Sequence, residues 1–209
     1  HIAVKASNKT QVQKVVVALK QEERHYVFDG VFSPAAHQSG VYGTVVSSIV
    51  KQVIAGFNGT VLAYGQTGTG KTYSMGILHE ITIPLTSRCG IIPRALNDLF
   101  AARARIQKAG SCRIVLSFLQ IYQDDVQDLL EGEGAAGQAL SIRESPDEGF
   151  FCEGLIEAEV DSAQAAMAVV NNGLKHRTMA ETSMNITSSR SHTILTVMLE
   201  QKQMMEGAA

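Results

Sequence analysis

The sequence predicts a single α/β domain, with helices layered on a largely buried sheet, and three observations support this. Strand-like and helix-like segments alternate through the middle of the chain, an order typical of layered α/β folds. The 209 residues are 45% hydrophobic and 18% charged, which is sufficient for one substantial core. No internal repeat or long low-complexity tract divides the chain, so residues 1–209 are interpreted as one domain.

The first half of the chain is expected to pass from strands to a helix and back to a strand. Three β-rich runs predict strands at residues 2–6, 14–19 and 26–32, the last with an Asp-Gly turn signal. Val41, Val45, Ile49 and Val53 recur at four-residue spacing, with Val46 and Val50 alongside them, which predicts one face of an amphipathic helix over residues 38–54. Residues 60–64 are β-branched and aromatic, and a buried strand is expected there.

The second half predicts a helix, a long strand, a hairpin, a further helix and a closing strand. Residues 91–108 form the first helix, with proline tolerated in its opening turn, and residues 113–122 form the long strand. A short helical turn is expected at 126–130, and a hairpin joins 140–143 to 150–152. The last helix starts at a cap at 161 or 162 and runs to about 179, before a strand at 192–201.

Composition narrows the class of protein. A net charge of −2 argues against a nucleic-acid binder, which usually carries a basic excess. The basic clusters at 103–108 and 175–177 are interpreted as solvated helix faces. Apolar runs stay below the roughly 18 residues that span a bilayer, and the first ten residues lack a signal-peptide pattern. Three widely spaced cysteines favour reduced cytosolic thiols over a disulfide framework or a metal site.

A glycine-rich loop lies between the strand predicted at 60–64 and a helix expected to begin near residue 70. It satisfies the pattern G-x-x-x-x-G-K-[ST] in full. Its glycines free the backbone N–H groups to surround phosphate oxygens, its lysine suits the β- and γ-phosphates, and its last hydroxyl suits Mg²⁺. The predicted phosphate-binding residues are Gly65, Gln66, Thr67, Gly68, Thr69, Gly70, Lys71 and Thr72. The loop alone leaves a kinase, a switch and a motor open.

A second polar group of residues lies at 183–193, just before the closing strand. It concentrates hydroxyl side chains with an asparagine, an arginine and a histidine. A polar connecting loop would explain this composition. Beside a phosphate loop, such side chains also suit a segment that senses a γ-phosphate and orients an attacking water.

Several motifs together resemble the kinesin motor-domain family. "NITSSRSH" (185–192) is similar to the family's switch I signature N-x-x-S-S-R-S-H, and "AGFNGTVLAYGQTGTGKTYSM" (55–75) to its extended phosphate-loop signature. Further similar segments follow in the family's order: "YVFDGVF" with Gln38 and "VYGTV" behind it, upstream of the nucleotide site, and then "GIIPRALNDLF", "SFLQIYQDDVQDLL", "LSIRES", "GFFCEGL" and "NNGLKHRTMAETSMN". The resemblance therefore covers nearly the whole chain.

The resemblance implies a P-loop NTPase fold of kinesin motor type, with three helix–sheet–helix layers around a mostly buried mixed sheet. It implies ATP or ADP and Mg²⁺ as cofactors. By position, Tyr73 would pack near the base or ribose, and Thr72 and Ser189 would serve the metal, the latter directly or through water. Asn185 and Ser188 would order the γ-phosphate and the lytic water, and Arg190 would pair with a switch II glutamate.

The chain departs from the family pattern in two places. No D-x-x-G begins at any aspartate, so the D-L-A-G-S-E switch II is absent from this sequence, and Ser7-Asn8-Lys9-Thr10 replaces the family's R-x-R-P. The fold is therefore expected to be incomplete, covering about the N-terminal two thirds of a motor domain without its microtubule-facing part. Hydrolysis by this piece alone stays open.

Three functions are compared. The first is an ATP-driven motor domain that moves along microtubules, cytoplasmic and bound to the cytoskeleton, with tubulin as partner and any dimer formed through regions outside this chain. The second is a non-motile, nucleotide-holding microtubule-binding protein of the same family. The third is a small-molecule kinase with a P-loop, which is disfavoured because the arginine-rich lid of such enzymes is not evident.

Overall fold

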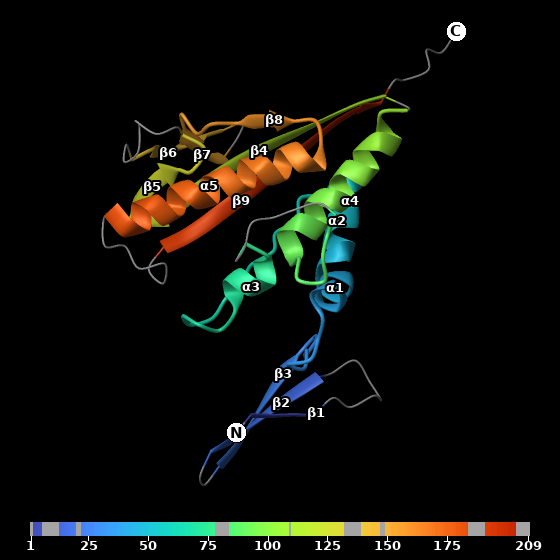
Figure 1. Ribbon diagram of the computed structural model, residues 1–209, viewed down its shortest axis with the longest axis vertical. Coiled ribbons are helices and arrows are strands. Elements are labelled where there is room, and N and C mark those ends of the chain that lie inside the picture. The colour runs from blue at the N-terminus through green and yellow to red at the C-terminus, as the bar shows by residue number, and fades with distance from the viewer. Residues whose placement is uncertain are drawn as a thin grey trace.

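A computed structural model describes residues 2–5, 13–19, 22–77, 84–108, 110–131, 139–146, 149–183 and 191–203 (Figure 1). The strands are β1 (Ile2–Lys5), β2 (Gln13–Leu19), β3 (Glu22–Phe28), β4 (Gly110–Tyr122), β5 (Asp125–Asp128), β6 (Ser141–Ser145), β7 (Gly149–Glu153), β8 (Ala158–Val160) and β9 (Ser191–Gln203). The helices are α1 (Gln38–Val41), α2 (Ser47–Ile54), α3 (Lys71–Met75), α4 (Ile91–Ile106) and α5 (Ala163–Ser183). Among these residues, no helix is both long and apolar enough to cross a membrane.

The main sheet is organised around β4, which pairs antiparallel with β5, β8 and β9. The β4–β9 ladder is continuous, from Gly110 opposite Gln203 to Tyr122 opposite Ser191. Since side chains alternate along a strand, every second residue of β4 points to the same face. Three of these, Ile114, Leu116 and Phe118, are almost completely buried, and they form the centre of the core.

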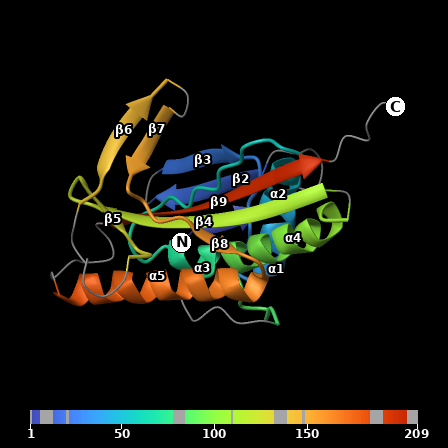
Figure 2. The same ribbon diagram turned by 90° about the horizontal axis from the view of Figure 1, so that it is seen from above.

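Helices α4 and α5 cover this buried face of the sheet (Figure 2). Leu96 and Leu99 of α4, and Met167 and Val170 of α5, pack in the same core as the β4 side chains. The spacing of three residues within each pair places both side chains on one face of the helix. Both helices were predicted. Helix α5 begins after Ser162, whose hydroxyl accepts a hydrogen bond from the Ala165 N–H at 3.2 Å, the N-terminal cap that the sequence indicated.

Helices α1 and α2 form one helical rod, because a π-helical turn at Tyr42–Val46 joins them. The rod confirms the helix predicted at 38–54, and the buried side of the predicted apolar face is the row that contains Val46 and Val50, not the row that contains Val45. Tyr42, Val46 and Val50 are buried, whereas Val45 is 46% exposed. A four-residue spacing exceeds the 3.6-residue α-helical turn and would drift around the rod. The wider π turn offsets that drift and keeps the stripe on the core.

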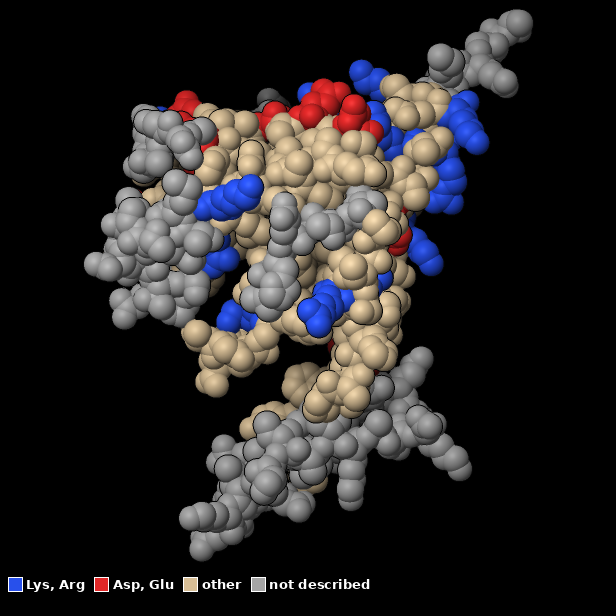
Figure 3. Space-filling view, in the orientation of Figure 1, with Lys and Arg blue, Asp and Glu red and all other residues tan. Residues whose placement is uncertain are grey.

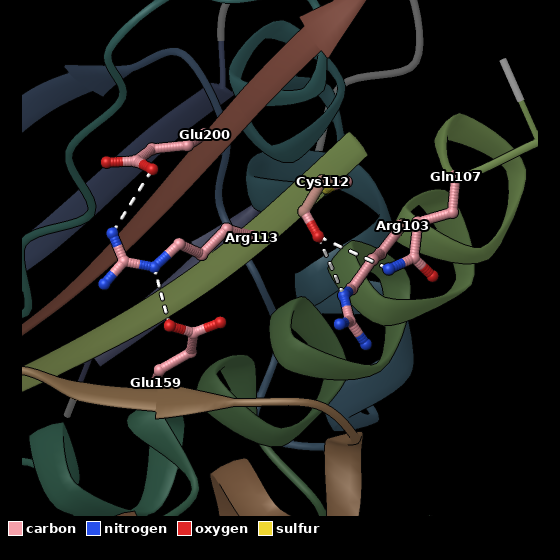
Figure 4. Close-up of polar contacts among 6 residues, drawn as sticks. All are labelled: Arg103, Gln107, Cys112, Arg113, Glu159 and Glu200. Atoms are coloured by element: carbon pink, nitrogen blue, oxygen red, sulfur yellow. Dashed lines mark hydrogen bonds and ion pairs between the residues drawn. The ribbon is translucent and has the colours of Figure 1, made fainter. Parts of the chain in front are cut away.

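The polar contacts around β4 fasten α4 to the sheet (Figure 4). Arg103 Nε and Gln107 Nε2 donate to the Cys112 carbonyl at 3.2 and 3.4 Å. A second set of contacts joins β4 to its neighbouring strands. Arg113 pairs with Glu159 of β8 at 2.7 Å and with Glu200 of β9 at 3.4 Å. Lys and Arg side chains gather where α4 ends (Figure 3). Arg103 belongs to the basic cluster at 103–108 that was predicted to be a solvated helix face. Its hydrogen bond to the Cys112 carbonyl gives it a structural role instead.

Two smaller sheets complete the described chain. β1, β2 and β3 form an antiparallel sheet beyond the start of α1 (Figure 1). β6 and β7 form the predicted hairpin, with Ser141 opposite Glu153 and Ser145 opposite Gly149. Phe150, at the tip side of that hairpin, is 76% exposed. The strand expected at 26–32 starts earlier and ends at Phe28, and the Asp-Gly step following it does not form a hairpin turn.

Two predicted elements were wrong. Residues 125–128 form β5, not a helical turn, because Gln123 and Asp124 adopt positive φ angles of 49° and 71°. Two successive positive φ angles make the tight turn that suits a β-hairpin, and β5 therefore returns along β4. Residues 60–64 are not a buried strand: they pair with no described strand, and Leu62 and Tyr64 are 82% and 95% exposed.

The contact between Gly173 of α5 and Phe118 of β4 gives a stability prediction. A Cβ atom at residue 173 would lie 2.9 Å from Phe118 Cε1 and closer still to its Cδ1, and Phe118 is buried, with 2% of its surface exposed. We expect Gly173→Ala to destabilise the fold by about 1–3 kcal/mol through overpacking, although alanine is intrinsically the better helix former by about 1 kcal/mol. Urea denaturation measures the change.

Gly40→Ala is the matched control, because nothing lies within 4 Å of a Cβ at that helical position. This variant should gain about 0.5–1 kcal/mol. Equal or greater stability of Gly173→Ala would show that α5 does not pack on Phe118 this closely.

Candidate functional site

The phosphate loop has the backbone geometry that only glycines adopt readily. Gly65, Gly68 and Gly70 have φ angles of 152°, 81° and 91°, values that disfavour residues with a Cβ. At Gly65 a Cβ would also lie 2.7 Å from Thr69 Oγ1. The loop therefore depends on these glycines for its conformation, and not merely for its flexibility.

The loop is held together by its own polar groups. Lys71 Nζ donates to the Gly65 carbonyl at 2.7 Å and to the Gln66 carbonyl at 2.8 Å. Thr69 Oγ1 donates to the same Gln66 carbonyl at 2.8 Å. The lysine ammonium thus lies at the mouth of the loop, where it can meet an anion, and Gln66, Thr67 and Thr69 are exposed around it.

Helix α3 carries the remaining predicted phosphate and metal residues. Gly70 is its N-cap in a left-handed conformation, and the Ser74 N–H donates to the Gly70 carbonyl at 2.8 Å. Lys71 and Thr72 are half-buried in its first turn, while Tyr73 is 50% exposed. The helix was expected near residue 70, and it forms there, although it ends after five residues at Gly76.

Two neighbours that sequence reasoning did not identify fix α3 in place. Gly76 and Gly90 approach so closely that a Cβ on Gly76 would lie 2.6 Å from the Gly90 nitrogen. Gln38, the first residue of α1, donates from Nε2 to the Tyr73 carbonyl at 2.6 Å. The family resemblance placed Gln38, with "VYGTV" behind it, in the segment upstream of the nucleotide site, but it indicated no partner for the side chain.

The second predicted group of residues falls outside the described part of the chain. Asn185, Ser188, Ser189 and Arg190 all lie there, between the end of α5 at Ser183 and the start of β9 at Ser191. At that start, Arg177 Nη2 donates to Ser191 Oγ at 3.4 Å. The beginning of β9 and the phosphate loop lie on the same side of the molecule in both ribbon views (Figures 1 and 2).

Burial raises the pKa of three side chains elsewhere in the fold, Tyr42, Cys112 and Cys152. Tyr42 donates its hydroxyl to Asp98 Oδ2 at 2.6 Å, and burial, followed by this hydrogen bond and the Asp98 charge, raises the pKa of Tyr42. All three cysteines are free thiols. Within the described residues, no group of three or more histidine, cysteine or acidic side chains could hold a metal ion.

Comparison with known proteins agrees with this architecture. The family model described as "Kinesin motor domain" matches residues 1–209. The chain is 39% identical over 181 residues to the chromosome-associated kinesin KIF4 of Gallus gallus, covering 87% of this chain and 15% of that protein. It is 38% identical to the kinesin-like protein klp-20 of Caenorhabditis elegans, over 88% of this chain and 28% of that protein.

A solved structure of a fast kinesin superposes on this fold with a TM-score of 0.83 at 29% sequence identity. The match covers 95% of this chain and 54% of that one. The chain thus spans about half of the solved motor and a smaller part of the curated relatives. With the phosphate loop in place and the family model matching from end to end, this chain belongs to the kinesin motor domain family.

Proposed function

We propose that residues 65–72 bind the phosphates of ATP or ADP as the nucleotide site of a microtubule motor. The observation that carries this is the loop geometry: three glycines with positive φ lead into Lys71 at the start of α3. Such a loop turns backbone N–H groups toward an anion, and the lysine adds a compact positive charge. The family supports a nucleoside triphosphate over other anions.

The chemistry of the side chains fits a nucleotide with its metal. Lys71 already donates to two backbone carbonyls of the loop, so phosphate oxygens would replace neutral acceptors by charged ones and make stronger hydrogen bonds. Thr72, half-buried beside it, would supply a hydroxyl to Mg²⁺, which prefers oxygen ligands. Tyr73, half-exposed on the same helix, would pack against the base or ribose. The bound metal would neutralise charge on the phosphates.

Asn185, Ser188, Ser189 and Arg190 complete the proposed site as a γ-phosphate sensor. The segment enters β9 at Ser191, and β9 is paired with β4 along its whole length. A segment attached to so rigid a strand can pass a local change at the nucleotide to the rest of the domain. Contacts to a γ-phosphate exist only before hydrolysis, so they suit a switch.

The partner and the whole activity follow from family membership. The proposal is a MgATP-hydrolysing motor domain that binds microtubules, is located on the cytoskeleton and acts within a longer protein. A dimer would form through regions outside this chain. The match to part of a fast kinesin favours movement over a non-motile, nucleotide-holding role, and the second experiment below separates the two.

Replacing Lys71 tests the phosphate site. Lys71→Ala removes the ammonium that donates to the Gly65 and Gln66 carbonyls, and we expect nucleotide affinity to fall about a hundredfold, because charge-assisted hydrogen bonds contribute roughly 1.5–3 kcal/mol each. Titration of a fluorescent ADP analogue measures the affinity. Lys51→Ala, which removes an exposed lysine of α2, is the control and should bind normally. Unchanged affinity in Lys71→Ala would refute the phosphate assignment.

Phosphate release with and without polymerised microtubules tests the motor function. In the intact protein, we expect microtubules to raise the rate at least tenfold, because track binding and nucleotide state are linked. Binding to microtubules without turnover would instead support the non-motile alternative. Turnover that ignores microtubules would contradict both.

Ser189→Ala in the intact protein tests the sensor segment. The hydroxyl is proposed to act on the metal or its water, so the variant should bind ADP as the wild type does while kcat falls at least tenfold. Steady-state kinetics with parallel ADP titration separates the two effects. If kcat is unchanged, residue 189 has no such role.

A further inference from the structure

We propose that Gln38 is a positioning residue of the nucleotide site, and this rests on the function proposed above. Its side chain is 4% exposed, and its Nε2 donates to the Tyr73 carbonyl at 2.6 Å across 35 residues of sequence. Gln38 lies outside the phosphate loop and reaches the helix through a backbone atom. Its effect on nucleotide is therefore exerted through the placement of α3, which bears Lys71 and Thr72.

The hydrogen bond is a tertiary tie, because α3 does not need it to satisfy its backbone. The Tyr73 carbonyl already accepts the Gly76 N–H at 3.1 Å, and a carbonyl has a second lone pair for Gln38. Burying a glutamine amide costs free energy unless it is hydrogen-bonded. The contact with Tyr73 therefore offsets that cost and fixes which side of α3 faces α1.

Gln38 can act in this way because the rod behind it is anchored along its length. One turn on, Tyr42 binds Asp98 of α4, and then Val46 and Val50 are buried in the core. At the far end, Gln201 Nε2 of β9 donates to the Ile54 carbonyl at 2.8 Å. The rod is thus held by α4 and by the sheet, and its first residue is a rigid support for α3.

Contacts at both ends of α3 determine its position and its rotation. The Gly76–Gly90 contact fixes its C-terminal end against the start of α4, and Met75 packs against the core at the same end. Without a contact nearer the first turn, α3 could rotate about that end. The Gln38 hydrogen bond is made to Tyr73, the residue next to Thr72, and it prevents this rotation. Loss of this hydrogen bond would leave the fold intact but would disorder Lys71 and Thr72, the residues proposed to bind phosphate and metal.

The test compares Gln38→Asn and Gln38→Leu with wild type in the full chain. Asparagine keeps the amide but is one methylene too short to span the contact, and leucine removes the donor altogether. Gln52→Asn, the same change at an exposed position of α2, is the matched control. MgADP affinity is measured by titration, and melting temperature is measured with and without saturating MgADP.

We expect both Gln38 variants to bind MgADP about five- to tenfold more weakly, the value of one ordinary hydrogen bond. The stabilisation given by a fixed concentration of MgADP should shrink accordingly, while Gln52→Asn matches wild type. A lower melting temperature with unchanged MgADP affinity would show that Gln38 serves the fold alone, and would overturn the proposal. If one variant fails to fold, the other decides.

The results for wild type, Lys71→Ala and the Gln38 variants together distinguish failure of the positioning role from failure of the nucleotide site. If wild-type protein does not bind MgADP, or Lys71→Ala binds it equally well, then the nucleotide site is wrong and the role of Gln38 falls with it. If wild type binds, Lys71→Ala does not, and the Gln38 variants bind as wild type does, only the positioning role is refuted.

Discussion

The rest of the structure depends on the antiparallel ladder between β4 and β9. Because the two strands pair from Gly110–Gln203 to Tyr122–Ser191, apolar side chains of both strands pack in one core with those of α4 and α5. The same ladder fixes both ends of β9. Its start receives the chain from α5 beside Arg177, and Gln201 near its end binds the last turn of α2.

The phosphate loop, in contrast, is held by helices. The residues before it pair with no described strand, so the loop's position comes from α3, which is fixed by α1 through Gln38 and by α4 through the Gly76–Gly90 contact. The loop itself is closed by Lys71 on its own carbonyls. The loop thus has support from two helices outside it and a positive charge held at its mouth by its own carbonyls.

Local sequence patterns predicted some parts of the candidate site and of the fold, but not others. The phosphate loop could be predicted because spacing and residue type specify it: glycine adopts positive φ far more readily than residues with a Cβ, and the lysine follows directly. Helices α4 and α5 and strand β4 were predictable because long periodic runs express burial directly. β5 could not be, since two residues without glycine, Gln123 and Asp124, adopt a turn that normally contains it. The strand predicted at 60–64 was wrong for a different reason. An apolar run indicates that burial is favourable, but it does not show that a neighbouring strand is available to pair with it.

By itself, the sequence determined the glycine-rich loop before α3, the order of the major elements and the family, because each is encoded in residues close together in the chain. Only the tertiary structure decided which face of the α1–α2 rod is buried, and that Gln38 reaches Tyr73 and Gly76 meets Gly90. Those contacts join residues that are far apart in sequence. They form only where the helices pack against one another and on the sheet, and the sequence around each residue does not specify that packing.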